Sequence, residues 1–396
     1  MPIFNANHRY DDIKLRPEDE LLLCCARTNV NSEIKAKILF LVQNKLDWDY
    51  LLDLTSMHRL IPLLYHNLNS ICPELVPEDI LKKLNDIFNF NIHNNLLLTG
   101  ELITILDKLE SQGITGIPHK GSSLAIFAYN NLTLRQFNDI DIIINTSDTP
   151  KVRKLLLSLD YEFDSYPKNM DESLYFRTQT EHKFVNKTKN IVVEIHNTFQ
   201  GHFFNFPMDS EFLHKKENLE ILNINNYQTN ILSTENLILI LCVHCAKHNW
   251  SRISWICDIH EIIQNKKINW SKLVENADKL CIKRILLINL FLAFDLFGLK
   301  LSDEIWNLFY NDSNIIKISM QIKKRLFLID NNSLTIFERA FLDLKKRENL
   351  RMSILDVLST ITKPTYADFE ELPLPSFLFY FYYLIRPILL LKRMPP

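Results

Sequence analysis

Glycine is scarce in this chain, which has six glycines in 396 residues. Three of them, Gly113, Gly116 and Gly121, lie close together, shortly before two aspartates, Asp139 and Asp141. Glycine is used where the backbone needs a positive φ, or where another group must come close to the backbone. Because glycine is so rare in the rest of the chain, this stretch is the first candidate for a functional site.

Other features are missing as well. The formal net charge is only −2, so no general field attracts nucleic acid, and we expect no long nucleic acid as a partner. The opening MPIFNANHRYDD lacks the apolar centre of a signal peptide. The seven cysteines are an odd number without framework spacing, which predicts reduced thiols and a cytoplasmic protein.

Long apolar runs are also lacking. The most apolar stretch is the tail LPLPSFLFYFYYLIRPILLLKRMPP, and Arg386 and Pro387 interrupt it. Its unbroken length is below the ~20 residues of a membrane-spanning helix, so we expect no transmembrane segment. The tail is predicted to be a helix docked on the protein's own core, with contact to a membrane surface as the alternative.

The spacing of apolar residues divides the chain into three parts. Apolar residues recur every three or four positions before residue 110 and after residue 233, as they do in helices. In between, short strands alternate with short helices. The sequence predicts an α+β fold with these domains: an N-terminal helical region (1–110), a small mixed-sheet core (111–228) and a C-terminal helical region (229–396).

Three acidic residues are candidate metal ligands. Asp139 and Asp141 lie on a predicted strand, and residues two apart on a strand point to the same face, with Cβ atoms roughly 7 Å apart. Two such carboxylates repel unless a cation lies between them, and Mg²⁺ or Mn²⁺ suits these oxygen ligands. Glu194 shares a face with His196 and would complete the group if its strand lies beside the first. His182, on the preceding strand, is a further candidate for the same face.

A phosphate site is predicted next to these acids. Gly121 follows a short strand and precedes a short helix, and the N–H groups at a helix start bind phosphate. Ser122 adds a hydroxyl donor and Lys120 a positive charge. The pattern therefore predicts a polyphosphate against Gly121, with the aspartates holding the metal that bridges to it. Each motif alone is common in turns and solvated strand ends, so the prediction depends on their order along the chain.

At these residues the chain resembles the nucleotidyltransferase fold of DNA polymerase β and the kanamycin nucleotidyltransferases. It is more similar to bacterial nucleotidyltransferase family proteins that are uncharacterised, through Lys120-Gly121, Arg135, the aspartate pair and the acid-x-His motif ending in His196. Flanking segments at 47–68, 244–259 and 372–387 resemble that family too. Gly121 and Asp139 are 18 residues apart, a longer connection than minimal nucleotidyltransferases have.

The resemblance implies roles for these residues. Asp139 and Asp141 would hold the metal ions that bridge the triphosphate, and Glu194 would complete a second metal site or act as a base toward the acceptor. Lys120 and Arg135 would neutralise the triphosphate. Two metal ions of this kind stabilise the attacking and leaving oxygens.

A histidine cluster follows in the C-terminal region. His244 and His248 are four residues apart and share a helix face, and Asp258 lies ten residues further on. Three interpretations are open. They are a zinc site, a structural cluster packed on tryptophan, or a helix that closes over the cleft and brings these histidines and Lys247 to the nucleotide or acceptor.

Three functions follow from these patterns. The first is a nucleotidyltransferase that moves a nucleoside monophosphate from an NTP, with ATP expected, to a hydroxyl or phosphate of a small molecule, peptide, protein or RNA. The second is a module that binds nucleotide or a partner without turnover, and the third is a hydrolase with the same metals. Retention of all three acids favours the first, because a scaffold gains little from adjacent carboxylates. Nothing in the sequence indicates the oligomeric state.

Overall fold

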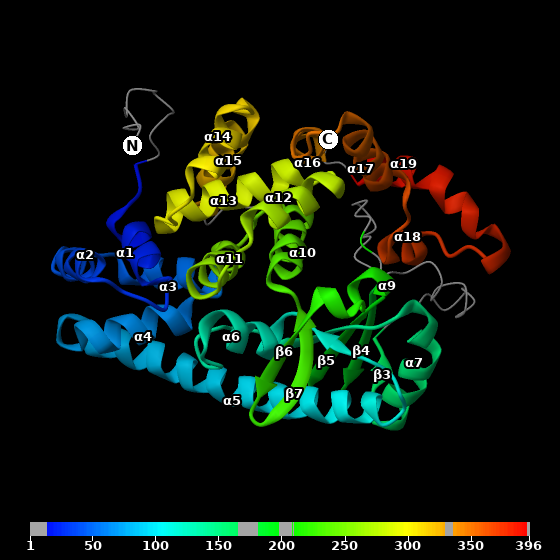
Figure 1. Cartoon of the computed structure of the whole chain (residues 1–396), viewed down its shortest axis with the longest axis horizontal. Helices are drawn as coiled ribbons and strands as arrows, with labels where there is room; N and C mark the ends of the chain where they lie inside the picture. The colour runs from blue at the N-terminus through cyan, green and yellow to red at the C-terminus, as the bar shows by residue number, and fades with distance from the viewer. Residues whose placement is uncertain (1–13, 165–180, 198–207, 209, 329–335, 394–396) are drawn as a thin grey trace.

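The structure is a computed structural model that describes residues 14–164, 181–197, 208, 210–328 and 336–393. A small mixed sheet lies at the centre of the chain, with helices before and after it in sequence (Figure 1). This confirms the predicted α+β class. The division of the chain into three domains stays a prediction.

Helices form the N-terminal part, and the longest of them, α5, has 33 residues and runs beneath the sheet and the other helices in Figure 1. It begins directly after Pro77, where two acidic residues face the positive end of the helix dipole. It ends at Glu110, and Gly113 just after it has a φ of +70°, which allows the closing turn that the sequence predicts. The helices are α1 (Pro17–Cys25), α2 (Ser32–Val42), α3 (Trp48–Met57), α4 (Ile61–Ile71), a short 3₁₀ turn η1 (Pro73–Leu75) and α5 (Glu78–Glu110).

The central sheet has five strands in the order β1-β2-β5-β4-β3. Strands β2 and β5 are parallel neighbours, and the other pairs are antiparallel. A separate hairpin, β6–β7, follows. The elements are β1 (Ile117–Pro118), α6 (Gly121–Tyr129), β2 (Asp139–Ile143), η2 (Thr146–Asp148), α7 (Thr149–Ser158), β3 (Glu162–Phe163), β4 (Glu181–Asn186), β5 (Ile191–His196), α9 (Ser210–Leu213), η3 (Lys216–Asn218), β6 (Leu219–Ile224) and β7 (Tyr227–Leu232).

Helices return after β7, as predicted. Helices α10, α11 and α13 pack together, and α13 is buried along most of its length. The helices are α10 (Thr234–Lys247), α11 (Ile253–Asn265), α12 (Trp270–Lys279), α13 (Lys283–Phe297), α14 (Asp303–Tyr310), α15 (Ser313–Leu326), α16 (Ile336–Lys345), α17 (Leu350–Thr362), α18 (Tyr366–Glu371), η4 (Ser376–Phe381) and α19 (Tyr382–Lys392). Within the described residues, no helix is both long and apolar enough to cross a membrane.

The C-terminal tail packs on its own neighbours. Phe369, Phe379 and Tyr382 form a small cluster separate from the main core, while Leu384 and Ile388 on α19 are exposed. The tail helix docks on α17, α18 and η4, so the prediction that it docks on the main core is wrong.

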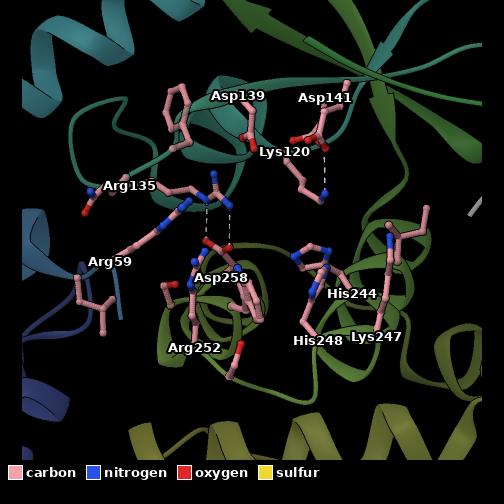
Figure 2. A pocket seen from close by; sticks show the side chains of 18 of the residues that line it. Arg59, Lys120, Arg135, Asp139, Asp141, His244, Lys247, His248, Arg252 and Asp258 are labelled. Atoms are coloured by element: carbon pink, nitrogen blue, oxygen red, sulfur yellow. Dashed lines mark hydrogen bonds and ion pairs between the residues drawn. The ribbon is translucent and has the colours of Figure 1, made fainter. Parts of the chain in front are cut away.

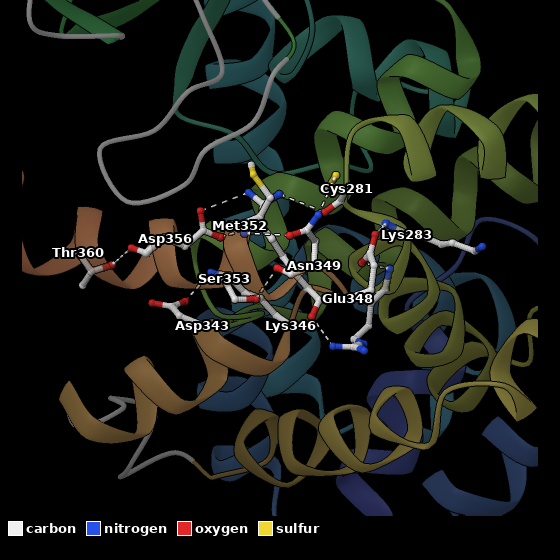
Figure 3. Close-up of polar contacts among 12 residues, drawn as sticks. Cys281, Lys283, Asp343, Lys346, Glu348, Asn349, Met352, Ser353, Asp356 and Thr360 are labelled. Atoms are coloured by element: carbon white, nitrogen blue, oxygen red, sulfur yellow. Dashed lines mark hydrogen bonds and ion pairs between the residues drawn. The ribbon is translucent and has the colours of Figure 1, made fainter.

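The loop between α16 and α17 joins these helices to α13 (Figure 3). Arg347 forms a fully buried ion pair with Asp356 (Nε to Oδ2, 2.6 Å) and donates a hydrogen bond to the carbonyl of Cys281 (3.1 Å). The Glu348 carboxylate accepts from the first two N–H groups of α13, at 3.1 and 3.0 Å. A carboxylate at a helix start is favourable, so this loop stabilises the beginning of α13.

Candidate active site

The three predicted acids lie on neighbouring parallel strands. In the register of β2 and β5, Asp141 is paired with Glu194 and Asp139 with Val192. Because side chains alternate along a strand, both aspartates, Glu194 and His196 share one face. The strand with Glu194 therefore lies beside the aspartate strand, as predicted.

Asp141 is the most strongly held of these acids. Its carboxylate accepts a hydrogen bond from Lys120 Nζ (3.0 Å) and lies 2.9 Å from His196 Nε2. Burial alone would raise its pKa, but Lys120 and the hydrogen bond with His196 outweigh burial and hold the pKa well below its usual value. Asp141 is therefore a fixed negative charge at the floor of the site.

The pKa values of Asp139 and Glu194 are shifted upward, in contrast to that of Asp141. Burial and then the charge of Asp141 raise the pKa of Asp139. Burial, followed by repulsion from Glu181 and Asp141, raises the pKa of Glu194 to about 7. A carboxyl group with a pKa near neutrality can exchange a proton with a bound molecule at physiological pH.

Glu181 is a site residue that the sequence analysis missed. It begins β4, lines the cleft, and pairs with Lys247 on α10 (3.3 Å). Burial would raise its pKa, but His196 and Lys247 outweigh burial and lower it to about 2. The alternation of β4 contained the signal: Phe184 must face the core, so Glu181 and Lys183 must face the other way.

The same alternation takes His182 away from the site. Its ring is fully buried on the opposite face of β4, where Nε2 lies 3.3 Å from the Asn197 amide. Burial lowers its pKa to about 4, so the ring is neutral. The predicted cleft candidate is thus a core histidine.

The glycine-rich stretch is explained largely by packing within the chain. Gly121 has a φ of +53°, and a Cβ there would lie 3.2 Å from the Asp139 carbonyl oxygen. A Cβ on Gly116 would press on Leu109 and Ile142, at 2.9 and 3.1 Å. The absence of side chains therefore lets α5, α6 and β2 approach one another.

Of Lys120, Gly121 and Ser122, only Lys120 lines the cleft directly. Ser122 is buried, and its hydroxyl accepts a hydrogen bond from Thr99 on α5 (2.9 Å). Lys120 is the residue before α6, and its ammonium reaches the face that carries Asp141. Burial lowers its pKa, and Asp141 more than compensates, so the net shift is upward and Lys120 is charged.

Arg135 lines the cleft but is engaged by Asp258. The guanidinium donates two hydrogen bonds to that carboxylate, at 2.9 and 3.0 Å, and Asp258 also accepts from the Tyr129 hydroxyl at 2.7 Å. Burial opposes the charge on Arg135, but Asp258 raises its pKa overall. This network joins the loop before β2 to helix α11.

The two histidines of the predicted cluster pack against a tryptophan ring. The rings of His244, His248 and Trp255 have centroids 4.6 to 5.3 Å apart. Burial and then Lys120 hold the pKa of His244 well below its usual value, and burial and Lys247 lower that of His248 to about 3. Asp258 pairs with Arg135 instead of joining the histidines. The predicted zinc site therefore lacks its third ligand, which argues against the zinc interpretation.

Two groups of possible metal ligands occur among the described residues. Within each, the ligand atoms lie within 4.8 Å of one another, and the groups are His119, Asp141 and His196, and Glu181, Glu194 and His196. Crowding of negative charge already raises the pKa of Glu194, and a divalent cation would relieve it. The carboxylate oxygens and histidine nitrogens of these groups fit a divalent metal, with Asp139 on the same face although outside both groups.

These residues line one cleft of about 380 Å³ between the sheet and helices α10 and α11. Figure 2 shows two sides to it. Arg59, Arg135 and Arg252 lie at one end, while Asp141, Lys120 and Lys247 lie at the other. Of the candidates His244, Lys247, His248 and Asp258, all four line the cleft. Arg59 and Arg252 were not predicted, because nothing in their local sequence links them to the sheet.

The model of a family described as uncharacterised nucleotidyltransferases matches residues 44–298, which is more than half of the chain. The chain belongs to this family. The resembling segments at 47–68 and 244–259 lie inside the matched residues, and 372–387 lies outside them.

A comparison with curated proteins gives no match. Among solved structures, the chain is similar to an antigenic nucleotidyltransferase-like protein from Paracoccidioides brasiliensis. The identity is 16%, the match covers 46% of this chain and 88% of that chain, and the TM-score is 0.27. A TM-score this low adds nothing to the argument. Family membership supports a role in nucleotidyl transfer with a nucleotide substrate.

Proposed function

We propose that this protein is a metal-dependent nucleotidyltransferase. It moves a nucleoside monophosphate from an NTP, with ATP as the expected donor, to a hydroxyl or phosphate of an acceptor in the cytoplasm. The observation that carries the proposal is the convergence of Asp139, Asp141 and Glu194 from two paired parallel strands on one cleft, next to Lys120. The cleft volume is in the range of small-molecule sites.

In the reaction, an oxygen of the acceptor attacks the α-phosphorus of the NTP and forms the new P–O bond. The bond from the α-phosphorus to the bridging oxygen breaks, and pyrophosphate leaves with that oxygen. With a hydroxyl acceptor, the proton passes to Glu194, whose pKa of about 7 lets it accept one at neutral pH.

Asp139 and Asp141 would hold Mg²⁺ or Mn²⁺, and Glu194 would complete a second metal site where it does not act as the base. When bound, such ions stabilise negative charge on the phosphate oxygens in the transition state. Asp141 is ionised in advance by Lys120 and His196, so it is ready to bind a cation. Glu181 adds negative charge on the side of Glu194.

Nucleotide binding is proposed for Lys120, Gly121, Ser122 and Arg135. Lys120 has the first role, because its ammonium already lies in the cleft beside Asp141. Ser122 would have to become exposed, and Arg135 would have to release Asp258, before either could reach a phosphate.

The test is pyrophosphate release from each NTP with Mg²⁺ and a cell extract as the source of acceptors, with mass spectrometry of the product. We expect Asp139→Asn and Asp141→Asn to lower turnover by at least about a hundredfold, since each removes a metal ligand. Chelation by EDTA should have the same effect. The control is Asp160→Asn, which changes an exposed aspartate outside the cleft.

Glu194→Gln separates chemistry from binding. It keeps the shape of the side chain, so we expect Mg·ATP affinity within about tenfold of wild type while most transfer activity is lost. Normal transfer in either aspartate variant would contradict the proposal. Metal-dependent NTP binding without pyrophosphate release would favour a binding module, and release of phosphate or nucleoside monophosphate without an acceptor would favour a hydrolase.

A further inference from the structure

The backbone at Arg59 has a conformation that usually belongs to glycine. Helix α3 ends with the Arg59 N–H bonded to the Ser56 carbonyl (3.1 Å) and the Leu60 N–H to the Thr55 carbonyl (3.0 Å), and Arg59 has a φ of +56°. The end of α5 has the same pair of bonds, with Gly113 in the corresponding position. A residue with a Cβ is disfavoured there, so the arginine costs conformational energy.

The side chain of Arg59 lies in the cleft, in the vicinity of Asp139. It is half-buried, and its guanidinium makes no hydrogen bond or ion pair within the described part of the chain. Burial lowers its pKa, and the charge of Asp139, which lines the same cleft, acts in the opposite direction. A strained backbone that presents an unpaired cation to a site is typical of a functional residue.

Arg252 comes from a distant part of the chain to the same end of the cleft (Figure 2). It directly precedes α11, its guanidinium lies 5.2 Å from the centre of the Trp255 ring, and no carboxylate among the described residues pairs with it. Burial and then Arg59 lower its pKa, so the two guanidinium groups repel each other. Two half-buried cations held together favour an anion between them.

The other cations of the cleft already have acidic partners. Lys120 pairs with Asp141, Arg135 with Asp258, and Lys247 with Glu181. Arg59 and Arg252 are therefore the cleft arginines whose charge is left for a ligand.

The position of the two arginines relative to the acids indicates which anion they take. On the proposed function, the acceptor oxygen lies toward Glu194 and Glu181, and the leaving group departs in line on the opposite side of the α-phosphorus. Arg59 and Asp139 line the same cleft, and Arg59 lies at the end away from Lys247, the partner of Glu181. We propose that Arg59 and Arg252 form a subsite for the β- and γ-phosphates of the NTP donor and hold pyrophosphate as it leaves.

The experiment is calorimetric titration of wild type, Arg59→Gly and Arg252→Gln with Mg·ATP, AMP and inorganic pyrophosphate with Mg²⁺. We expect each variant to weaken ATP and pyrophosphate binding by about tenfold or more, because each loses a charge-assisted contact to phosphate. AMP lacks the β- and γ-phosphates, so its affinity should change by less than about twofold.

The matched control is Asp160→Gly. Asp160 has a φ of +61° and closes α7 with the same pair of bonds, to Leu157 and Leu156, but it is exposed and outside the cleft. Glycine relieves the backbone at both positions, so we expect both variants to melt at the wild-type temperature or above it. Only Arg59→Gly should lose phosphate affinity.

Equal ATP and pyrophosphate affinity in wild type and Arg59→Gly would overturn the subsite, while wild-type transfer activity would leave the proposed function standing. Equal weakening of AMP would overturn it too, because the contact would not be to the terminal phosphates. Loss of pyrophosphate binding with unchanged ATP affinity would assign the arginines to a phosphate of the acceptor and overturn the donor assignment. If the protein binds pyrophosphate through Arg59 but binds no NTP, the two arginines form an anion site. The proposal that an NTP is the donor would then be wrong.

Discussion

Glu181 and Glu194 are neighbours whose pKa values are shifted in opposite directions. Lys247 and His196 keep Glu181 ionised, whereas Glu194 is crowded by Glu181 and Asp141 and has a pKa near 7. The charge of Glu181 therefore contributes directly to the basicity of Glu194. A residue outside the predicted catalytic group thus tunes a member of it.

We expect Glu181→Gln to lower the pKa of Glu194, because it removes a neighbouring negative charge. The measurement is an NMR titration of ¹³C-labelled glutamate carboxyl groups in metal-free protein. Glu101, which forms an ion pair with Lys189 away from the cleft, provides the internal reference. An unchanged Glu194 pKa in the variant would show that burial alone sets it.

The sequence predicts some of these residues and not others for a physical reason. Asp139, Asp141 and Glu194 follow from strand alternation, which is a local property. The alternation of β4 places Glu181 on the face opposite Phe184, but only the pairing of β4 with β5 brings that face to the cleft. Arg59 reaches the cleft through the packing of α3 and α4 against distant elements, and no local pattern encodes that approach.

At the scale of elements, α5 holds the long connection between α6 and β2. Side chains of its asparagines donate to backbone carbonyls of that connection: Asn91 to Thr133 (3.1 Å), Asn94 to Phe137 (2.9 Å), and Asn95 to Leu132 and Arg135 (both 2.8 Å). A buried loop needs partners for its backbone groups, and these amides supply them. The 18-residue separation that the sequence shows is therefore an ordered segment that presents Arg135.

We expect Asn95→Ala to destabilise the protein by about 1–3 kcal/mol, because it removes two hydrogen bonds and leaves the Arg135 carbonyl with only the longer bond from Asn91 (3.5 Å). Asn94→Ala is the matched control, since it removes one bond from a less buried position, and it should cost less. Urea denaturation followed by circular dichroism measures both. Equal losses would mean that the number of bonds does not set the cost.

The same connection is joined to α11 by a charge pair. Asp258→Asn would keep hydrogen-bond acceptance from Tyr129 but leave the buried Arg135 without a counter-charge. We expect a loss of about 3–5 kcal/mol in the free energy of unfolding. Thermal melting checks it, and a variant as stable as wild type would show that Arg135 finds another anion. Exposed Asp303→Asn is the control.

At the scale of the whole molecule, buried histidines connect distant parts of the chain. His58, which follows α3, lies with Nε2 2.7 Å from the Leu326 carbonyl, and its Nδ1 accepts from the Ile253 N–H (3.2 Å). This neutral ring satisfies both contacts, and a proton on Nδ1 would oppose the Ile253 N–H. Burial lowers the pKa of His58 to about 4 and that of His260 to about 3.

These shifts predict acid sensitivity. In the unfolded chain the histidines titrate near 6.5, so between pH 6.5 and about 4 the unfolded state binds more protons than the folded state. The contribution of these histidines to the free energy of unfolding is therefore fully present above pH 6.5 and is lost as the pH falls. Each histidine contributes a slope of up to about 1.4 kcal/mol per pH unit. His58→Gln should reduce the slope by that amount in urea titrations from pH 7 to 4.5, and an unchanged slope would contradict the assignment.

The residues that line the cleft run from Arg59 to Asp258 and all lie in the first two thirds of the chain. Synthesis on the ribosome starts at the N-terminus, so every one of these side chains is made before α13 emerges. Helix α13 covers α10 and α11, the two helices that form one wall of the cleft. During that interval the apolar outer faces of α10 and α11 are exposed to solvent, and such surfaces aggregate or bind chaperones. The nascent chain is therefore most prone to aggregation after the cleft residues have been synthesised and before α13 packs on α10 and α11.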